Sequence, residues 1–303
     1  MYKSNVNLNL YKTFYDVAKF GSISKAAEES FTSQPAISKS IKNLEDQLST
    51  KLFYRKPNGV ELTDSGKELL YYVEKSYANL VTAERVLVET DDLQRGKLSI
   101  GMPSNIGTFL IFDKIISFHE TFPNIEITVI TGGTAYLLDL LDSHKIDFII
   151  DTAPIDISSS SDLVRKSLTS VHYCFAVSKN NTSIDPSKIK SIKDLKDKPL
   201  VLPIPGTANR TALDELLNKM NVTVENVLNI HTSEMILTAV KRNLGIGYVI
   251  KDIIKTAVED NMIEVLDIKE VLPSVDIDLV YNKKFLSKAP KVFIEEYIND
   301  LIK

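Results

Sequence analysis

Residues 33–48 read SQPAISKSIKNLEDQL and predict a short amphipathic helix. Ser33 is a good N-cap, because its hydroxyl can accept a hydrogen bond from a free amide of the first turn. Pro35 suits the start of a helix, where its missing N–H costs nothing and its fixed φ already fits. One buried stripe is predicted by apolar residues at steps of four, three and four, namely Ile37, Ile41, Leu44 and Leu48.

The opposite face of this helix is polar and cationic. It carries Gln34, Ser38, Lys39 and Lys42, with no carboxylate before Glu45. Such a face, rich in hydrogen-bonding groups at its N-terminal end, is typical of a helix that reads bases in the major groove of DNA. A surface helix with a solvated face explains the same pattern, and for this helix alone it is the better interpretation. The neighbouring segments reverse that preference.

Two further segments complete a helix-turn-helix layout. Leu8–Phe20 has apolar residues at a helical period and ends at Gly21. Either Ser22 or Ser24 caps a second helix, Lys25–Ser30, and a tight turn then leads into the helix quoted above. Helix, short turn and capped second helix are the arrangement of helix-turn-helix DNA-binding proteins.

A β-hairpin is predicted next, over Lys51–Thr63. Asn58 and Gly59 separate two apolar runs, and both residues tolerate a positive φ. Arg55 and Lys56 lie on this hairpin. One interpretation is a two-stranded wing that presents cations to phosphates. The other is an ordinary surface hairpin.

Residues 10–66 resemble the winged helix-turn-helix of the LysR-type transcriptional regulators. The matching pieces are Phe14-x-x-Val-Ala, Gly21-Ser-Ile-Ser-Lys-Ala-Ala-Glu, Ser33-Gln-Pro-Ala-Ile-Ser-Lys, Leu44-Glu, and Leu52-Phe-Tyr-Arg-(x6)-Leu62-Thr-x-x-Gly66. The family often has a second arginine three residues beyond the position of Arg55. This chain has Asn58 there, which puts one phosphate contact in doubt and makes Lys56 a candidate substitute.

The predicted DNA-binding surface has two parts. The groove-facing residues are Gln34, Pro35, Ser38, Lys39 and Lys42. The phosphate-facing residues are Thr32 or Ser33, Arg55 and Lys56, and Lys25 belongs to the same surface.

One long helix is predicted over residues 64–89, with Thr63 as its N-cap. A helix cannot bury an apolar stripe of this length alone, so a partner is implied; the stripe is Leu70, Val73, Tyr77, Leu80 and Leu87. The resemblance implies that this is the linker helix, which pairs with its mate in a homodimer. Packing against the chain's own body is the less favoured alternative. A dimer would place two recognition helices on two half-sites one turn apart.

Strands alternate with helices beyond residue 96. The order βαβαβ over residues 97–150, with helices at Thr108–Glu120 and Tyr136–Ser143, predicts a parallel sheet with helices on both faces. Residues 163–177 are predicted as two strands that cross over, and a second βα series runs from residue 199 to 250. A strand at Asp276–Tyr281 and a helix at Pro290–Ile302 close the chain. Two lobes of this kind resemble the periplasmic-binding-protein-like effector domain of the same family.

The predicted fold class is therefore α+β multidomain, with four parts. They are a winged helix-turn-helix domain (1–63), a linker and dimerisation helix (64–90), a hinge (91–96) and a two-lobed α/β effector-binding domain (97–303). Lobe I takes about 97–165 and 270–303, and lobe II about 166–269.

Four loops follow predicted strands, where open α/β sheets bind small ligands near helix N-termini. They span residues 103–108, 131–134, 203–207 and 231–233. Free amides and the positive helix end favour an anion such as a carboxylate. N-capping without a ligand explains each of Ser104, Thr207 and Ser233 equally well. We expect a cleft in which an effector meets Ser104, Asn105, Thr131, Gly132, Pro205, Gly206, Thr207, Thr232 and Ser233.

The net charge of −4 is unevenly distributed. The first 60 residues carry nine cations and five anions, which leaves a net charge of −8 on the remainder. A basic head on an acidic body indicates that only the head approaches nucleic acid. A single cysteine, no signal-peptide core and no apolar run of membrane-spanning length predict a cytoplasmic, nucleoid-associated protein with no membrane partner.

No enzyme, metal site or cofactor is predicted, apart from a small-molecule effector of unknown identity. The four histidines lack the spacing of metal ligands, and neither a phosphate-binding loop nor a nucleophile elbow occurs. The resemblance implies double-stranded DNA with a dyad operator, a homodimer that assembles into a homotetramer, and RNA polymerase as partners.

Two other classes of protein compete with this interpretation. A solute-binding protein with two lobes would leave the head unexplained and would need an export signal. An enzyme on a similar two-lobed fold, such as a deaminase of the porphyrin pathway, would need a reactive, exposed cysteine at Cys174.

Overall fold

The computed structural model describes residues 6–57, 59–88, 93, 95–158, 162–224 and 227–302. These residues form two compact units. The chain passes from the first to the second between Arg85 and Val86, and Asp142–His144 group with the first unit. Some predicted features fall partly outside the described residues. They are the hairpin turn at Asn58, the end of the long helix and the hinge at residues 89–92 and 94, and the start of the strand at Asn226.

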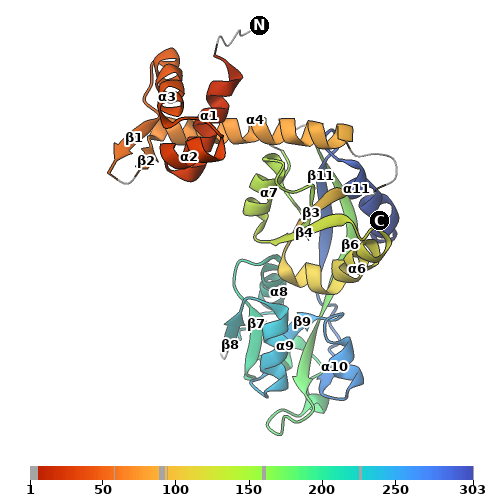
Figure 1. Ribbon diagram of the computed structural model, residues 1–303. Coiled ribbons are helices and arrows are strands. Elements are labelled where there is room, and N and C mark those ends of the chain that lie inside the picture. The colour runs from red at the N-terminus through yellow and green to blue at the C-terminus, as the bar shows by residue number, and fades with distance from the viewer. Residues whose placement is uncertain are drawn as a thin grey trace. The chain divides into compact units, whose positions relative to one another are not determined.

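The first unit has the predicted winged helix-turn-helix order (Figure 1). Its elements are α1 (Leu8–Phe20), α2 (Ile23–Glu29), α3 (Gln34–Leu48), β1 (Phe53–Lys56), β2 (Gly59–Leu62) and α4 (Asp64–Val88). Gly21 ends α1 with φ 60°, as predicted. Of the two candidate caps for α2, Ser22 takes the role, since its Oγ accepts from the backbone N–H of Lys25 at 3.3 Å.

One apolar core joins the helices of the first unit. Its buried members are Phe14, Val17, Ala26, Ala27, Ile37, Ile41, Leu44, Leu52 and Val73. The adjacent alanines bring α2 close to its neighbours, and the α3 stripe points inward as predicted. The polar face of α3 is therefore left outside.

The first half of the α4 stripe packs on this same core. Val73 is buried, and Leu69, Leu70 and Tyr77 pack against the cluster. The expectation that a partner buries the stripe is therefore wrong for this half, because the chain's own helices cover it. Leu80, one turn further on, is 53% exposed.

The second unit is built on a nine-stranded sheet among the described residues, in the order β4-β3-β5-β11-β6-β9-β7-β8, with β10 paired to β6. The strands are β3 (Gly96–Met102), β4 (Ile125–Thr131), β5 (Phe148–Thr152), β6 (Leu163–Ser178), β7 (Leu200–Pro203), β8 (Val227–Ile230), β9 (Ile246–Ile250), β10 (Ile263–Val265) and β11 (Ser274–Asn282). β3 runs parallel to β4 and β5, and β7 runs parallel to β8 and β9. The predicted parallel βα series are thus confirmed.

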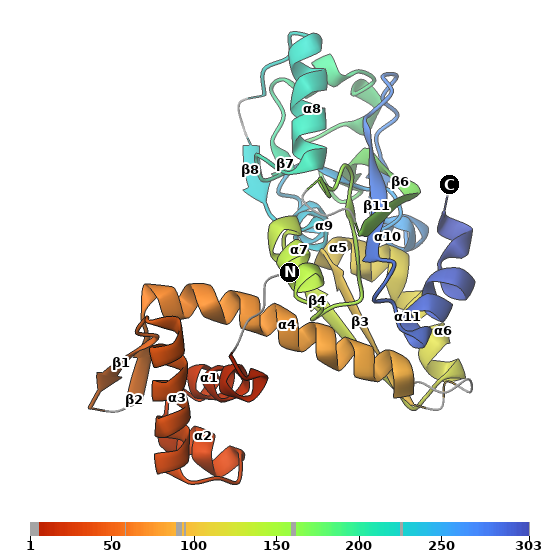
Figure 2. The ribbon, with the colours of Figure 1, turned by 90° about the horizontal axis from the view of Figure 1, so that it is seen from above.

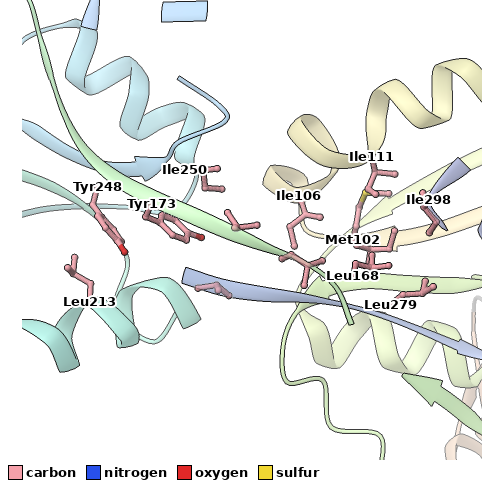
Figure 3. Packing of buried hydrophobic residues seen from close by; sticks show 14 of the residues in the cluster. Met102, Ile106, Ile111, Leu168, Tyr173, Leu213, Tyr248, Ile250, Leu279 and Ile298 are labelled. Carbon is pink, nitrogen blue, oxygen red and sulfur yellow. The ribbon is translucent and has the colours of Figure 1, made fainter. Parts of the chain in front are cut away.

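Residues 163–178 form one strand rather than the two predicted. Their sequence contains neither glycine nor proline, so nothing in it interrupts the extended backbone. The first part of β6 pairs with β11 and its last part with β9, both antiparallel. Figure 3 shows buried side chains at both ends of this strand, with Met102 and Leu279 in one group and Tyr173 and Tyr248 in the other.

Helices cover the sheet of the second unit (Figure 2). They are α5 (Ser104–Ile106), α6 (Phe112–Thr121), α7 (Thr134–Asp142), α8 (Ala208–Lys219), α9 (Ser233–Lys241), α10 (Lys255–Glu259) and α11 (Lys288–Val292), with 3₁₀ turns η2 (Pro186–Lys188), η3 (Ile192–Leu195) and η5 (Asn299–Leu301).

Two helices depart from the predicted regular form through π-helical turns, η1 (Gly107–Ile111) and η4 (Phe293–Tyr297). The first joins α5 to α6, so the helix predicted from Thr108 begins earlier. The second follows α11 and breaks up the helix predicted for the C-terminus. Phe293 and Ile294, the first two residues of η4, are both buried.

Candidate functional site

The α3 helix presents its polar side to solvent. The Oγ of Ser33 accepts from the backbone N–H of Ala36 at 3.4 Å, which confirms the predicted cap. Gln34, Lys39 and Lys42 are exposed, and Ser38 is half-buried. Thr32, Ser33, Pro35 and Lys25 are exposed beside them. This is the surface on which base-reading side chains would stand.

The β1–β2 hairpin is held against the turn between α1 and α2. Lys56 pairs with Gly59 at its tip, and the backbone N–H of Val60 donates to the carbonyl of Gly21 at 2.9 Å. Gly59 has φ 142°, and a Cβ there would lie 2.3 Å from the Gly21 oxygen. The hairpin therefore approaches the turn more closely than any other residue at this position would allow.

Glu45, near the end of α3, ties the hairpin to the helix. Its Oε1 accepts from the backbone N–H groups of Leu52 (2.9 Å) and Phe53 (3.3 Å), and its Oε2 accepts from Lys51 Nζ at 2.7 Å. Burial opposes ionisation of this carboxyl, but the bonds from Lys51 and the two amides outweigh burial and hold the pKa of Glu45 below its ordinary value. The helix and the wing are thus fixed relative to each other.

A groove of about 600 Å³ lies between α3 and the hairpin. Its polar lining is dominated by cations, namely Lys39, Lys42, Lys51 and Arg55. Lys51 was not among the predicted contact residues, although its position at the start of the hairpin could have identified it. Lys25, Thr32, Ser33, Gln34, Pro35 and Lys56 lie on the unit outside the groove lining.

The cations of this surface differ in their partners. Lys51 pairs with Glu45, and Lys56 Nζ lies 3.1 Å from Glu61 on the other strand. Within the described residues, ion pairs do not involve Lys25, Lys39, Lys42 or Arg55. These four charges are available to phosphates. Lys56 can bind a phosphate only if its exposed, weak ion pair with Glu61 breaks.

The second unit contains a cavity of about 820 Å³. It lies where the carboxyl ends of β3, β4, β5, β7 and β8 meet the starts of α5, α7, α8 and α9. Eight of the nine predicted effector residues line it: Ser104, Asn105, Thr131, Gly132, Gly206, Thr207, Thr232 and Ser233. Pro205 is not in the lining, although its neighbours Pro203 and Gly206 are. The strand-end rule therefore located the cavity.

The three residues considered as N-caps behave differently from that expectation. Pro103, not Ser104, occupies the cap of α5. Thr207 occupies the cap position of α8, but its hydroxyl donates to the carbonyl of Ile204 at 2.9 Å. It therefore makes no hydrogen bond to the first amides of the helix. Thr232 caps α9, since its Oγ1 accepts from Met235 N–H at 3.3 Å, and Ser233 is the first helical residue.

The lining also contains polar residues outside the predicted contact set. Thr134 and His231 lie in the predicted loops without being predicted contacts, and Asp151, Tyr173 and Asn209 lie outside those loops. Asp151 directly follows the predicted strand at residues 147–150, so the strand-end rule could have found it. Tyr173 lies within a strand, where alternation alone does not say which face meets a cavity. Burial raises the pKa of the Tyr173 phenol, with a hydrogen bond to Asn209 opposing the rise.

Cys174 does not meet the requirement of the enzyme alternative. Its side chain lies in the core with Val249 and Ile236, and burial raises the pKa of its thiol to about 11. The thiol is therefore protonated and shielded at neutral pH. In the part of the chain that the structure describes, acidic, histidine and cysteine side chains do not gather into a group that could hold a metal ion. None of the helices in that part combines the length and the apolar composition needed to span a lipid bilayer.

Comparison with protein families gives two matches that together cover both units. Residues 8–67 match the bacterial regulatory helix-turn-helix protein, lysR family, and residues 91–301 match the LysR substrate binding domain. Among curated proteins, the chain is 26% identical over 284 residues to a probable RuBisCO transcriptional regulator of Phaeodactylum tricornutum, with 92% of each chain covered. It is 24% identical to the HTH-type transcriptional regulator YofA of Bacillus subtilis, covering 96% of this chain and 97% of YofA.

Solved structures show the same fold over the full length. A full-length OxyR variant from Pseudomonas aeruginosa superimposes with a TM-score of 0.69 at 20% identity, covering 99% of this chain and 95% of that one. Full-length LysG from Corynebacterium glutamicum, with bound effector Arg, gives a TM-score of 0.64 at 15% identity and covers 98% of each chain. The chain belongs to the LysR family of transcriptional regulators, which bind DNA through a winged helix-turn-helix, form oligomers and respond to small-molecule effectors.

Proposed function

We propose that residues 1–63 bind DNA and residues 64–90 mediate dimerisation. Residues 91–96 form a hinge, and residues 97–303 bind the effector. Within the last part, lobe I takes about 97–165 and 270–303, and lobe II about 166–269. The separate apolar cores of the two compact units support the main division.

In this proposal Gln34, Pro35, Ser38, Lys39 and Lys42 read base edges in the major groove. Lys25, Thr32 or Ser33, Arg55 and Lys56 contact phosphates on either side. The observation that carries the assignment is the exposed cationic side of α3 and the hairpin, whose charges Lys25, Lys39, Lys42 and Arg55 have no ion partner among the described residues.

The effector is proposed to bind in the 820 Å³ cavity between the two lobes, with an anionic group near the starts of α8 and α9. Ser104, Asn105, Thr131, Gly132, Gly206, Thr207, Thr232 and Ser233 would contact it, with Pro205 shaping one loop. Free N–H groups and the positive end of a helix favour a carboxylate there. In support, Ser233 is 5% exposed and lines the cavity.

We further propose a homodimer through α4, assembled into a dimer of dimers on a dyad operator, and contact with RNA polymerase. The exposed Leu80 and Val81 support α4 as the pairing surface, since 53% and 60% of their side chains remain open. We propose no catalytic activity, in line with the transcriptional regulators to which the chain is similar. We also propose a cytoplasmic, nucleoid-associated location.

The DNA assignment is tested by a salt titration of duplex binding, measured as fluorescence anisotropy with the DNA upstream of the gene. Arg55→Ala should weaken binding and lower the slope of log affinity against log salt by about one unit for the lost phosphate contact, whereas Lys42→Ala should weaken binding and relax the sequence preference, because it removes a base contact. Lys12→Ala, an exposed lysine of α1 paired with Asp16, is the matched control and should leave the slope unchanged. Unchanged affinity and slope for both Lys42→Ala and Arg55→Ala would refute the assignment.

A further inference from the structure

Asp151 lies at the end of β5 and forms part of the cavity wall. Only 2% of its surface is exposed. It is the one carboxylate in the described lining, and no lysine or arginine lines the cavity with it. The nearby Arg210 of α8 is engaged elsewhere, because its Nε donates to Asp214 at 2.8 Å and its Nη1 donates to the Pro203 carbonyl at 2.8 Å.

All hydrogen-bond donors to Asp151 in the described structure are neutral. Thr134 Oγ1 donates to its Oδ2 at 2.7 Å, and the backbone N–H of Thr152 donates to its Oδ1 at 2.6 Å. The Thr152 hydroxyl adds a longer bond of 3.3 Å. A carboxylate has about four acceptor sites, so capacity remains for a ligand. Burial dominates the environment and raises the pKa of Asp151 above its ordinary value, because no cation compensates for the lost hydration.

Another part of the same cavity wall favours an anion. The α8 and α9 helices, of 12 and nine residues, both begin at the cavity, and the Thr207 hydroxyl at the start of α8 donates to the Ile204 carbonyl and does not cap the helix. This end favours an anion, whereas Asp151 favours a cation. An isolated buried carboxylate is costly, and a bound cation removes that cost.

We propose that the effector is a zwitterion of the amino-acid class, whose ammonium group pairs with Asp151 and whose carboxylate lies at the starts of α8 and α9. This proposal rests on the effector role of the cavity proposed above and specifies the ligand that the cavity takes. A cavity of about 820 Å³ falls within the usual range of roughly 300–1,000 Å³ for small-molecule sites.

The test measures binding of matched probes to the full chain by isothermal titration calorimetry, after a thermal-shift screen. The probes are the common amino acids, the carboxylic acids with the same side chain but hydrogen in place of the ammonium group, and the amines without the carboxylate. At least one amino acid should bind, and both truncated counterparts should bind about thirtyfold more weakly or worse, because each leaves a buried charge unpaired.

Asp151→Asn removes the charge and keeps the shape, with its amide oxygen still able to accept from the Thr152 N–H and its NH2 group able to donate to the Thr134 hydroxyl. In this variant the amino acid should bind no better than its deaminated counterpart. Asp113→Asn, an exposed carboxylate in the first turn of α6, is the matched control and should bind as the wild type does. The comparison of probes on the wild-type protein does not depend on how well either variant folds.

Three results would overturn the proposal. In the first, the wild type binds the amino acid and its deaminated acid equally well. In the second, Asp151→Asn still binds the amino acid more tightly than the deaminated acid. In the third, no nitrogen-bearing probe binds. A gel shift of the same protein with its upstream DNA separates this failure from a failure of the proposed function. Intact DNA binding with any of the three results removes the amino-acid effector alone.

Discussion

Two buried carboxyl groups respond to their surroundings in opposite ways. Burial disfavours the charge of both Glu45 and Asp151. Glu45 accepts hydrogen bonds from Lys51 and two backbone amides, and together these lower its pKa despite burial. Asp151 accepts only from neutral donors, which do not offset the rise in pKa that burial causes. The first group therefore stabilises the fold when ionised, and the second becomes stable in its ionised form only with a cationic partner.

Glu45→Gln should lower the stability of the protein at pH 7 by about 2 kcal/mol, since hydrogen bonds to a charged group are worth about 1.5–3 kcal/mol. The folded-state pKa of Glu45 lies below its unfolded value. Its contribution is therefore present above the unfolded pKa and is lost as the pH falls through the folded one. Chemical denaturation followed by circular dichroism at pH 7 and pH 4 should show the deficit shrink in acid. The exposed neighbour variant, Asp46→Asn, should show little change, and a deficit that stays constant with pH would contradict the role given to the charge.

Asp151→Asn should raise the stability of the ligand-free protein at pH 7. The folded-state pKa of Asp151 lies above its unfolded value, so the wild type loses stability as the pH rises through the folded pKa, and the asparagine variant does not. Thermal unfolding from pH 4 to pH 8 should show the advantage of the variant grow with pH. A variant less stable than the wild type by the same amount at every pH would mean that Asp151 serves only as a hydrogen-bond acceptor.

At the scale of elements, the join between wing and linker helix depends on the absence of a side chain. Gly66, in the first turn of α4, has no room for a Cβ, which would lie 2.2 Å from the backbone oxygen of Leu52. Thr63 fixes the same corner, since its Oγ1 accepts from Gly66 N–H at 2.9 Å and donates to the Lys51 carbonyl at 2.7 Å. The start of α4 is thus set by contacts with Lys51 and Leu52, the residues directly before β1.

Gly66→Ala should destabilise the first unit by about 1–3 kcal/mol, because the backbone at Leu52 must move to admit the methyl group. The comparison is with Ser65→Ala, an exposed neighbour in the same helical turn that should be nearly neutral. Chemical denaturation of the two variants provides the measurement. Equal stability of Gly66→Ala and the wild type would show that this corner is not tightly packed.

The sequence predicts elements well where local signals agree. In α3 the cap, the proline and the apolar stripe all indicate one helix, and the structure has it. Local signals do not identify the capping residue where neighbours are chemically alike. They also do not identify a site residue whose role depends on its burial in the folded structure. Thr232 and Ser233 are both good caps, and only the backbone path selects Thr232. The burial of Asp151 depends on how β5 meets α7, which no local pattern encodes.

At the scale of the whole molecule, a regulator of dyad DNA sites needs two copies in register. The first half of α4 is covered by the core of the first unit, and Leu80 and Val81 form a short exposed apolar stretch directly after it. Covering that stretch with the same helix of a second copy would bury it and set the spacing of the two recognition helices.

Leu80→Glu should weaken dimerisation by at least about tenfold, because burial of a leucine side chain is worth about 2 kcal/mol and two like charges would face each other. Leu80→Met keeps the apolar volume and should dimerise as the wild type does. Sedimentation velocity over a range of concentrations measures both. Unchanged assembly of Leu80→Glu would place the dimer contact away from this part of α4.

The most direct measurement is a nuclease footprint of the full chain on the intergenic DNA that precedes its own gene. Recognition helices held in a dimer should protect two half-sites whose centres lie about 10 base pairs, or a multiple of that, apart. Uniform cleavage across this DNA, at protein concentrations that cover the whole range of specific affinities, would contradict a DNA-binding role for the first unit.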